Sequence, residues 1–209
     1  MFAQHTRPHA NRRDTKAKNK KLICPIFNES KYPYHGIGLK LGDPFALTYK
    51  FYGSKHFSFA VDAGKSSSGL YGRYYRDKFN DYIRTDTLTN GASIWYLTEK
   101  VKADWVGELK FLYSFDASML SPGLQIYGGL GVQGKSTDLE YVYQHSSNYI
   151  GKFQRNRSTL GQTTIIGIEY NYFELPISAF MEMELFIDVL KDPGLKRFQG
   201  GVGLRYVFR

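Results

Sequence analysis

The chain has 209 residues and a formal net charge of +9, a length that suits one domain or two small ones. Its 17 Tyr, 15 Phe and 21 Gly favour strands and tight turns over helices. No run of about 18 apolar residues occurs, which excludes a transmembrane helix but not a transmembrane barrel, whose strands need only about 10 alternating residues each.

Residues 1–33 are predicted to form an N-terminal arm, because they show no hydrophobic periodicity and few apolar groups. Residues 1–34 carry eight Lys and Arg against Asp14 and Glu29, a net charge of +6, whereas the remaining residues carry only +3. The basic character therefore belongs mainly to the arm. The opening letters MFAQ, residues 1–4, resemble the end of a secretory signal peptide.

From residue 34 onward, apolar and polar residues alternate with a period of two in eight segments, which predicts eight β-strands. In the fourth segment, Val101 and Trp105 share the apolar face and Lys102 belongs to the opposite face. In the last segment, FQGGVGLRYVFR, Leu204 is on the apolar face and Arg205 on the other. The segments are 35–41, 45–52, 57–64, 101–115, 124–135, 163–173, 177–189 and 198–209.

The connections between the segments predict a meander with two different ends. Short turns at one end are predicted at 53–56, 116–123 and 174–176. At the other end, the sequence predicts the long polar loops 65–95 and 136–162 and the short links 42–44 and 191–196. No helix of useful length is predicted. Residues 34–209 are therefore assigned to an all-β, antiparallel up-and-down barrel of eight strands.

The alternation leaves two arrangements of such a barrel open. In a soluble carrier of the lipocalin kind, the apolar set would face inward around a ligand. In a transmembrane barrel, the apolar set would face lipid. Aromatic residues favour the transmembrane arrangement, because they gather near the short-turn ends of the strands, as in the girdle at a membrane interface. The predicted lipid-facing girdle comprises Phe51, Phe57, Phe115, Tyr170, Tyr172, Tyr206 and Phe208.

The opposite face of the strands carries charges and glycines. The interior of a closed eight-stranded barrel is just wide enough for side chains, so charges buried there must pair. Glycines on this face, such as Gly203, would leave room for long charged side chains. Lys40 and Arg205 are expected to share one network, which Glu182 and Glu184 join once the barrel closes. The predicted lumen charge network comprises Lys40, Lys50, Asp62, Asp104, Glu108, Lys110, Glu169, Glu182, Glu184, Asp188 and Arg205.

The last strand also resembles the C-terminal signature of Gram-negative outer-membrane barrels, in which alternating apolar residues lead to a closing aromatic residue. Here Phe208 is penultimate and Arg209 follows it. The resemblance covers about residues 34–209. It implies a small eight-stranded transmembrane barrel of the OmpA/OmpX type in the bacterial outer membrane. An even number of strands would put both chain ends, and so the basic arm, in the periplasm.

A closed eight-stranded barrel with a packed interior is a poor pore. The sequence is therefore interpreted as a non-enzymatic accessory or structural subunit of an envelope assembly. Its expected partners are outer-membrane lipid and lipopolysaccharide, and other envelope proteins that bind the arm or the Tyr- and Arg-rich segments 68–82 and 141–157. Alternatively, these two segments are strand extensions with a solvated rim.

Other classes of ligand are not expected. A nucleic-acid partner is disfavoured, because the arm would face a compartment without DNA. No cofactor is predicted. No metal site is predicted either, because the five histidines are scattered along the chain.

One motif keeps an enzymatic alternative open. The letters HSSN, from His145 to Asn148, resemble the H-x-S-N motif of outer-membrane lipid A 3-O-deacylases, which are also eight-stranded barrels. The resemblance implies that His145 is the general base and Ser147 the nucleophile. Glu140, slightly upstream, is the nearest carboxylate for orienting the histidine. A soluble lipocalin-like carrier is the second alternative.

Overall fold

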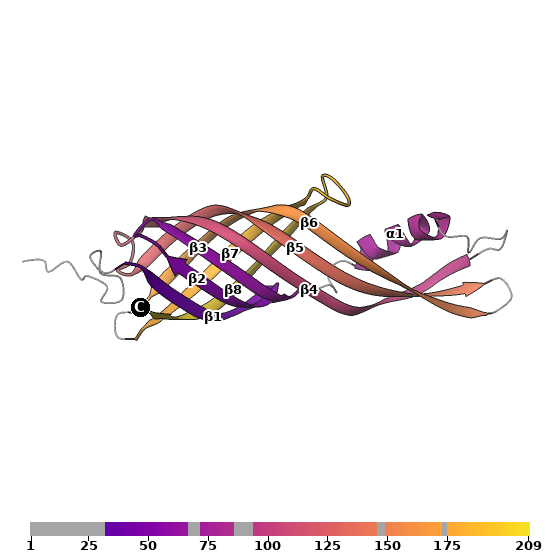
Figure 1. Ribbon diagram of the computed structural model, residues 1–209, viewed down its shortest axis with the longest axis horizontal. Helices are drawn as coiled ribbons and strands as arrows, with labels where there is room; N and C mark the ends of the chain where they lie inside the picture. The colour runs from indigo at the N-terminus through magenta and orange to yellow at the C-terminus, as the bar shows by residue number, and fades with distance from the viewer. Residues whose placement is uncertain (1–31, 67–71, 86–93, 146–148, 173–174) are drawn as a thin grey trace, which may run out of the picture.

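The computed structural model describes residues 32–66, 72–85, 94–145, 149–172 and 175–209 (Figure 1). Nearly all of the predicted arm at 1–33, including the predicted signal remnant at 1–4, lies outside these residues. Eight strands and one helix follow one another along the described chain. They are β1 (Tyr34–Asp43), β2 (Phe45–Tyr52), β3 (Phe57–Lys65), α1 (Gly72–Thr85), β4 (Ile94–Asp116), β5 (Leu124–His145), β6 (Ile150–Asn171), β7 (Ile177–Asp188) and β8 (Lys196–Phe208).

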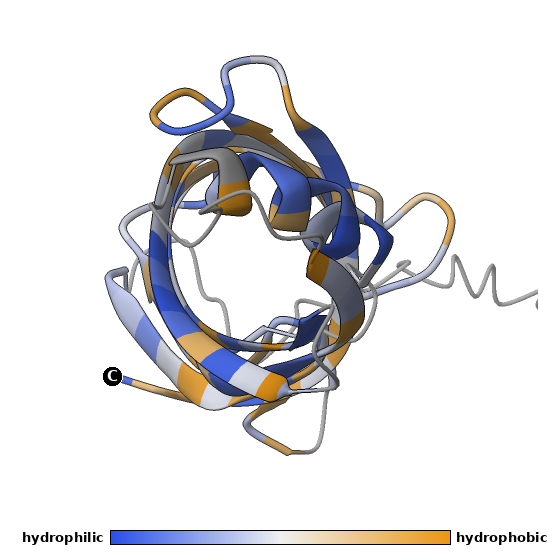
Figure 2. Ribbon diagram, turned by 90° about the vertical axis from the view of Figure 1, so that its right-hand side faces the viewer, coloured by the Kyte–Doolittle hydropathy of each residue, from blue (hydrophilic) through white to orange (hydrophobic). Residues whose placement is uncertain are grey.

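The eight strands form one closed antiparallel barrel in which each strand pairs with the next and β1 pairs with β8. Figure 2 shows the ring end-on. The register of the closing pair sets Ile37 opposite Tyr206 and Lys40 opposite Gly203. The prediction of an all-β fold with eight antiparallel strands in up-and-down order is confirmed.

Three neighbouring strands extend far beyond the others. β4, β5 and β6 have 23, 22 and 22 residues, whereas the remaining strands have 8 to 13. The β3–β4 pairing ends at Lys65 and Trp105, and the β6–β7 pairing ends at Asp188 and Gly161. Beyond these pairs the three long strands continue as a sheet (Figure 1). This sheet, here called the strand extension, comprises 94–104, 136–145 and 150–160.

The prediction of a long loop at 136–162 is therefore wrong, because most of this segment is strand. The alternative interpretation of 141–157 as strand extension agrees with the structure. In the strand extension, Leu139, Tyr141 and Tyr143 turn their apolar side chains toward the inside of the sheet, where they pack with α1. In the barrel the apolar set faces outward, so the pattern inverts between Val132 and Leu139. This inversion concealed the strand from a search for one continuous alternation.

The helix α1 packs against the inner face of the strand extension, so the prediction of no useful helix is also wrong. Tyr75, Phe79 and Ile83 recur every four residues and form its buried face, which contacts Leu139 and Tyr141 of β5. The first turn of α1 contains no acidic residue, so one of the usual signals of a helix start is missing. Among the described residues, no helix is long and apolar enough to cross a membrane.

Irregular pairing at the base of the strand extension changes which face some side chains occupy. The β4–β5 register shifts between Val101 and Ala103, as in a β-bulge. Val101 packs against the cluster under α1, and Lys102 pairs with Glu140 at 3.3 Å with half of its side chain exposed. The prediction that Val101 shares the outward face with Trp105 is wrong, because the extra residue of a bulge reverses the alternation.

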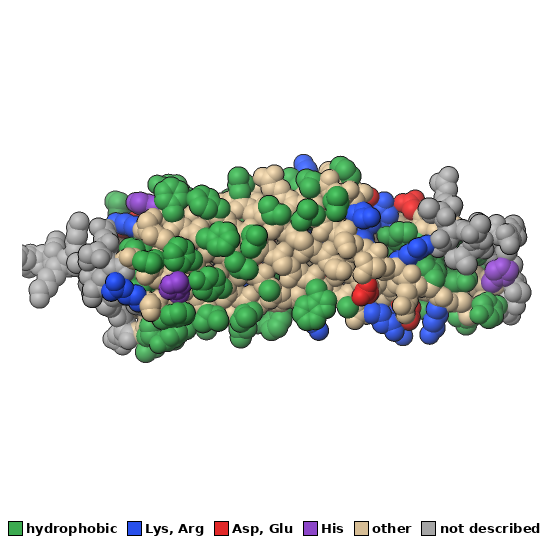
Figure 3. Space-filling model, viewed as in Figure 1, with side chains coloured by type: hydrophobic (Ala, Val, Ile, Leu, Met, Phe, Trp, Pro, Cys, Tyr) green, Lys and Arg blue, Asp and Glu red, His purple; other side chains and the backbone are tan. Residues whose placement is uncertain are grey.

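The two faces of the barrel wall carry opposite kinds of side chain. The apolar set faces outward, and Leu39, Leu130 and Leu204 are each more than 50 % exposed. The charged set faces inward, and Lys40 and Arg205 are at most 1 % exposed. Figure 3 shows hydrophobic side chains along the barrel and charged ones mainly toward its ends and on the strand extension. This orientation is the reverse of the one that a soluble carrier requires.

Inward-facing glycines leave space for large side chains of neighbouring strands. A Cβ atom at Gly203 would lie 2.4 Å from the ring of Phe180, and one at Gly201 would lie 3.1 Å from the aliphatic stem of Lys40. The sequence predicted that these glycines leave room for charged side chains, and this is the case at Gly201. Gly203 instead accommodates an aromatic ring.

Aromatic side chains close the short-turn end of the barrel. Tyr34, Tyr52 and Val207 are buried together inside the ring, and Tyr32 packs against them. The rings of Tyr32 and Tyr34 meet edge to face with their centroids 5.2 Å apart. This cluster separates the charged interior from the surroundings at that end.

Candidate functional site

The interior of the barrel is built largely from buried charged side chains. All eleven residues that the sequence assigns to a lumen network have an exposed fraction of 5 % or less: Lys40, Lys50, Asp62, Asp104, Glu108, Lys110, Glu169, Glu182, Glu184, Asp188 and Arg205. The period of two along each strand directs these side chains into the ring. The structure divides them into several groups at different positions along the barrel axis.

A central cluster surrounds the ammonium groups of two lysines. Lys110 Nζ lies 2.7 Å from Asp62 Oδ2 and 2.5 Å from Glu184 Oε1. It also lies 2.7 Å from Glu182 Oε1. Lys40 Nζ contacts the same two glutamates at 2.7 and 2.5 Å. Because every partner is buried, each ion pair compensates a desolvation cost of several kcal/mol per ion.

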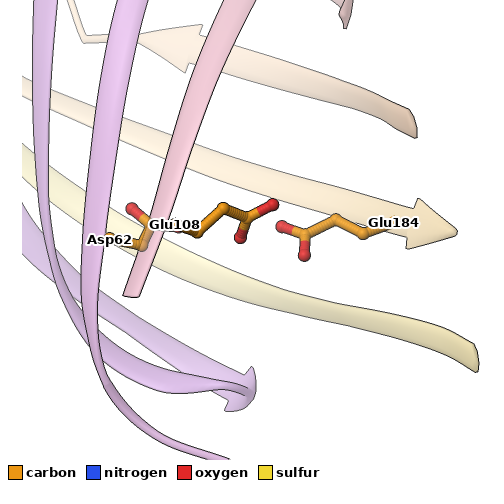
Figure 4. A group of neighbouring side chains, drawn as sticks. All are labelled: Asp62, Glu108 and Glu184. Atoms are coloured by element: carbon orange, nitrogen blue, oxygen red, sulfur yellow. The ribbon is translucent and has the colours of Figure 1, made fainter. Parts of the chain in front are cut away.

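Three carboxylates of this cluster have the spacing of metal ligands. Oxygens of Asp62, Glu108 and Glu184 all lie within 4.8 Å of one another (Figure 4). However, Lys110 Nζ lies among them, 2.7 Å from Asp62 and 3.4 Å from Glu108. An ammonium group therefore takes the position that a metal ion would need, and the three residues do not fit a metal centre.

A second cluster surrounds Glu169. Its carboxylate accepts hydrogen bonds from Lys50 Nζ and from the Tyr52 hydroxyl, both at 2.5 Å, and from the Ser178 hydroxyl. The Arg205 guanidinium lies 3.6 Å from the same carboxylate. Two cations and two hydroxyls thus compensate one buried carboxylate.

The structure puts Arg205 in a different cluster from Lys40, although the sequence grouped the two. Arg205 donates hydrogen bonds to the Thr48 hydroxyl at 3.2 and 3.0 Å and pairs with the second cluster. The register gives the reason, because Arg205 lies opposite Ser178 of β7, four residues from Glu182. The alternation along a strand determines which face of the barrel wall a residue occupies. The pairing of the strands determines its position along the barrel axis.

A third group lies toward the long-loop end. Lys135 Nζ donates to the Ser66 hydroxyl at 2.8 Å and pairs with Asp104 at 3.2 Å. Ser66 in turn donates to Asp43 at 2.9 Å, and the Thr137 hydroxyl donates to Asp104 at 3.1 Å. This group therefore links one cation and two carboxylates through an ion pair and a chain of hydrogen bonds.

Asp188 has a different role from the rest of the predicted network. Its Oδ1 accepts the backbone N–H groups of Leu190 and Lys191 at 2.9 and 3.1 Å. It therefore fixes the turn that leaves β7, as side-chain carboxylates do in Asx turns.

The predicted aromatic girdle lies on the outward face near the short-turn end of the barrel: Phe51, Phe57, Phe115, Tyr170, Tyr172, Tyr206 and Phe208. Two histidines that the sequence left unassigned join it. His35 stacks on Phe208 with ring centroids 5.6 Å apart, and His56 stacks on Tyr113 at 5.5 Å. Like Tyr, imidazole is amphipathic and suits the boundary between an apolar and a wet environment.

At the opposite end, one carboxylate ties α1 to the barrel. Asp192, in the link between β7 and β8, accepts hydrogen bonds from the Tyr74 hydroxyl and from Arg157 of β6. Lys78 of α1 lies 3.1 Å from the same carboxylate. Burial raises the pKa of Asp192, but these donors outweigh burial and hold that pKa well below its usual range. The polar attachment of α1 therefore converges on Asp192.

Replacing Asp192 by Asn is expected to loosen α1 while the barrel stays folded. The substitution removes the charge shared by Arg157 and Lys78, and the expected loss is about 1–2 kcal/mol, since the site is partly exposed. Trypsin should then cut faster after Arg73 or Arg76. The matched control is Asp81→Asn, since Asp81 also pairs with Lys78 but is 60 % exposed. Equal cleavage rates in both variants would contradict the role assigned to Asp192.

The same attachment has a defined pH dependence. Because the pKa of Asp192 is lower in the folded protein, its stabilising effect is complete above the pKa of about 3.9 of an unfolded Asp. The effect is lost as the pH falls below that value. At neutral pH, α1 should therefore stay attached.

The residues of the enzymatic alternative do not come together in the described chain. Glu140 lies between the inward-facing Leu139 and Tyr141, so it belongs to the other face of β5, where it is 8 % exposed and pairs with Lys102. His145 lies five residues further along the same strand, a spacing that places it on the opposite face. Ser147 lies outside the described residues.

Several polar partners in the interior were not singled out from the sequence. Thr163 donates to Glu108 at 2.7 Å, Tyr127 donates to Glu182 at 3.1 Å, and Gln133 donates to Gln199 at 3.0 Å. The alternation in the sequence already placed these residues on the inward face of their strands. Contacts such as that of Arg157 with Asp192 had no sequence signal, because they join segments 35 residues apart in the chain.

No protein-family model matches the chain, and no curated protein sequence matches it significantly. The function is therefore inferred from the geometry of the barrel and the chemistry of its two faces.

Proposed function

We propose that residues 34–209 form a small transmembrane barrel of the OmpA/OmpX type in a bacterial outer membrane. We also propose a non-enzymatic role for it as an accessory or structural subunit of an envelope assembly. The observation that supports this most is the inverted barrel wall, which is charged inside and apolar outside. Leaving a Leu side chain in water instead of an apolar environment costs about 1.5–3 kcal/mol. A lipid environment removes that cost along the whole belt.

The height of the apolar belt supports a membrane-spanning role. Along β4, the outward side chains from Trp105 to Phe115 are apolar or glycine. About ten steps of about 3.3 Å, at a strand tilt of about 40°, give a height of about 25 Å. This equals the apolar band of about 25 Å in outer-membrane barrels.

Above Trp105, the strand extension would stand outside the membrane. Its outward face carries Lys100, Lys102 and Lys152, and Lys65 lies over the Trp105 ring at 5.3 Å. Lysines just beyond an apolar belt suit anionic head groups, which supports lipopolysaccharide as a partner.

The interior argues against a channel. Charged clusters fill the ring, and Tyr34, Tyr52 and Val207 close one end. An eight-stranded barrel has room for side chains but not for a solute path. A structural or partner-binding role is therefore favoured over transport.

The tip of the strand extension supports partner binding. Trp95, Leu97, Tyr149 and Ile150 are each at least 45 % exposed there, separated from the belt by polar side chains. Exposed aromatic and aliphatic groups outside a membrane are typical of protein contact sites.

Two measurements test the proposal. Membrane fractionation should recover the protein in the outer-membrane fraction and in a folded state only with detergent or lipid. Gentle detergent purification should copurify a stoichiometric envelope partner that is lost in the Trp95→Ala, Tyr149→Ala double variant. Recovery as a water-soluble monomer would refute the barrel's location, whereas a lone monomer in detergent would refute only the accessory role.

A further inference from the structure

The two adjoining clusters inside the barrel contain more carboxylates than cations. Four cations are buried there: Lys40, Lys50, Lys110 and Arg205. Five carboxylates are buried with them: Asp62, Glu108, Glu169, Glu182 and Glu184. One negative charge is therefore left without a counter-ion in a dry environment, where an uncompensated charge is so costly that the group neutralises instead.

The geometry identifies where the missing positive charge belongs. Glu108 and Glu184 are 2 % and 1 % exposed, and their carboxylates point toward one another (Figure 4). The Oε2 atom of each has no hydrogen-bond partner. Their other oxygens are engaged, since Glu108 Oε1 accepts from Thr163 and Glu184 Oε1 accepts from Lys40 and Lys110. The nearest cation to Glu108 Oε2 is Lys110 Nζ, whose 3.4 Å contact is an ion pair without a hydrogen bond, so a proton could link the two facing oxygens.

Only the smallest cation suits this position. Lys110 Nζ already lies among the carboxylates, 2.5 Å from Glu184 and 3.4 Å from Glu108, and would repel a metal ion. A proton needs no coordination shell. Bound to one carboxyl, it donates a hydrogen bond to the other, as in pairs of acidic side chains that share a site.

We propose that Glu108 and Glu184 share one proton at neutral pH, so that the barrel interior contains a proton-binding site that forms only on folding. The site does not depend on the membrane, because every group that forms it lies inside the ring. The buried titratable groups of the two clusters around the pair are Lys40 of β1, Lys50 and Tyr52 of β2, Asp62 of β3, Lys110 of β4, Tyr127 of β5, Glu169 of β6, Glu182 of β7 and Arg205 of β8.

The shared proton makes stability depend on pH in an unusual direction. A proton that is bound in the folded state and released on unfolding stabilises the fold while the pH is low enough to supply it. The stabilisation is lost as the pH rises. Between about pH 5 and about pH 9, the range in which buried glutamates titrate, the melting temperature should fall by several degrees.

The test is Glu108→Gln in the full chain, measured in detergent across that pH range. The amide keeps the acceptor for Thr163 and supplies a permanent donor toward Glu184, so it mimics the protonated carboxyl. The variant should match the native protein at the acidic end and exceed its melting temperature at the alkaline end. Its pH dependence should be about half that of the native protein or less. An unchanged slope would overturn the proposal.

Two further measurements distinguish a shared proton from a general loss of stability and from a bound metal ion. Glu169→Gln, in the cluster whose carboxylate is fully compensated, should lower the melting temperature at every pH and leave the slope unchanged. Infrared difference spectra should show the carbonyl band of a protonated carboxyl in the native protein at neutral pH but not in Glu108→Gln. Stabilisation by calcium or magnesium that EDTA reverses and Glu108→Gln abolishes would instead show a metal ion and overturn the proton.

Discussion

Replacing Lys110 by Met should destabilise the barrel by about 3–5 kcal/mol, as expected when one partner of a buried ionic network is removed. Lys110 Nζ lies within 2.7 Å of Asp62, Glu182 and Glu184, so its loss leaves buried carboxylates without their main counter-ion. Met has a similar length and keeps the packing of the aliphatic stem. The effect should be measured as a change in the free energy of unfolding by urea in detergent or lipid.

The matched control is Lys55→Met. Lys55 pairs with Asp116 at 3.8 Å, but its side chain is 40 % exposed, and such surface pairs contribute less than about 1 kcal/mol. Adding Glu182→Gln to Lys110→Met should recover part of the loss, because it removes one of the stranded charges. If Lys110→Met costs no more than Lys55→Met, the interior is solvated rather than a compensated ionic network.

Replacing Leu130 by Arg should cost about 2–4 kcal/mol in a lipid bilayer, the range found for Arg near the midplane of an outer-membrane barrel. Leu130 lies near the middle of the outward apolar set of β5 and is 54 % exposed on the barrel surface. An Arg side chain there must reach toward an interface or draw water into the hydrocarbon. The free energy should be measured by reversible urea titration in phospholipid vesicles.

The same substitution at Leu97 provides the comparison. Leu97 is 45 % exposed, but it lies on the strand extension, beyond the proposed belt. Leu97→Arg should change stability by about 1 kcal/mol or less. Equal, small effects at Leu130 and Leu97 would mean that both face water, which would contradict the membrane-spanning proposal.

Both predictions follow from one structural property. The barrel wall has a charged inner face and an apolar outer face, and the side chains of each strand alternate between the two. A charge is tolerated inside only with partners, whereas an apolar side chain outside is favourable only in lipid. The positions of Lys110 and Leu130 therefore respond to different kinds of substitution, although both lie on paired strands of one sheet.

The extended end of the protein responds to other forces. There α1 fills the inner face with Tyr75, Phe79 and Ile83, and the bulge near Val101 reverses the alternation. The apolar side chains of β5 face outward in the barrel and inward in the strand extension, so no single apolar–polar alternation describes the whole strand. For this reason the strand extension was predicted as a loop, and α1 was not predicted.

The sequence by itself determined the number of strands, their antiparallel order and the inward face of the eleven charges assigned to the lumen. Each depends only on a period of two within a short segment and on the lengths of the turns. Thus Lys40, Lys110 and Arg205 were assigned to the interior before any pairing was known, and the structure buries all three.

Only the tertiary structure decided which charges meet. Register fixes the height of each side chain, so Arg205 joins Glu169, whereas Lys110 joins Glu184. It also brings Asp192 to Tyr74 across 118 residues and turns Glu108 toward Glu184. Such contacts depend on the closure of the ring and on the packing of α1, and these are properties of the whole chain that no local pattern of residues contains.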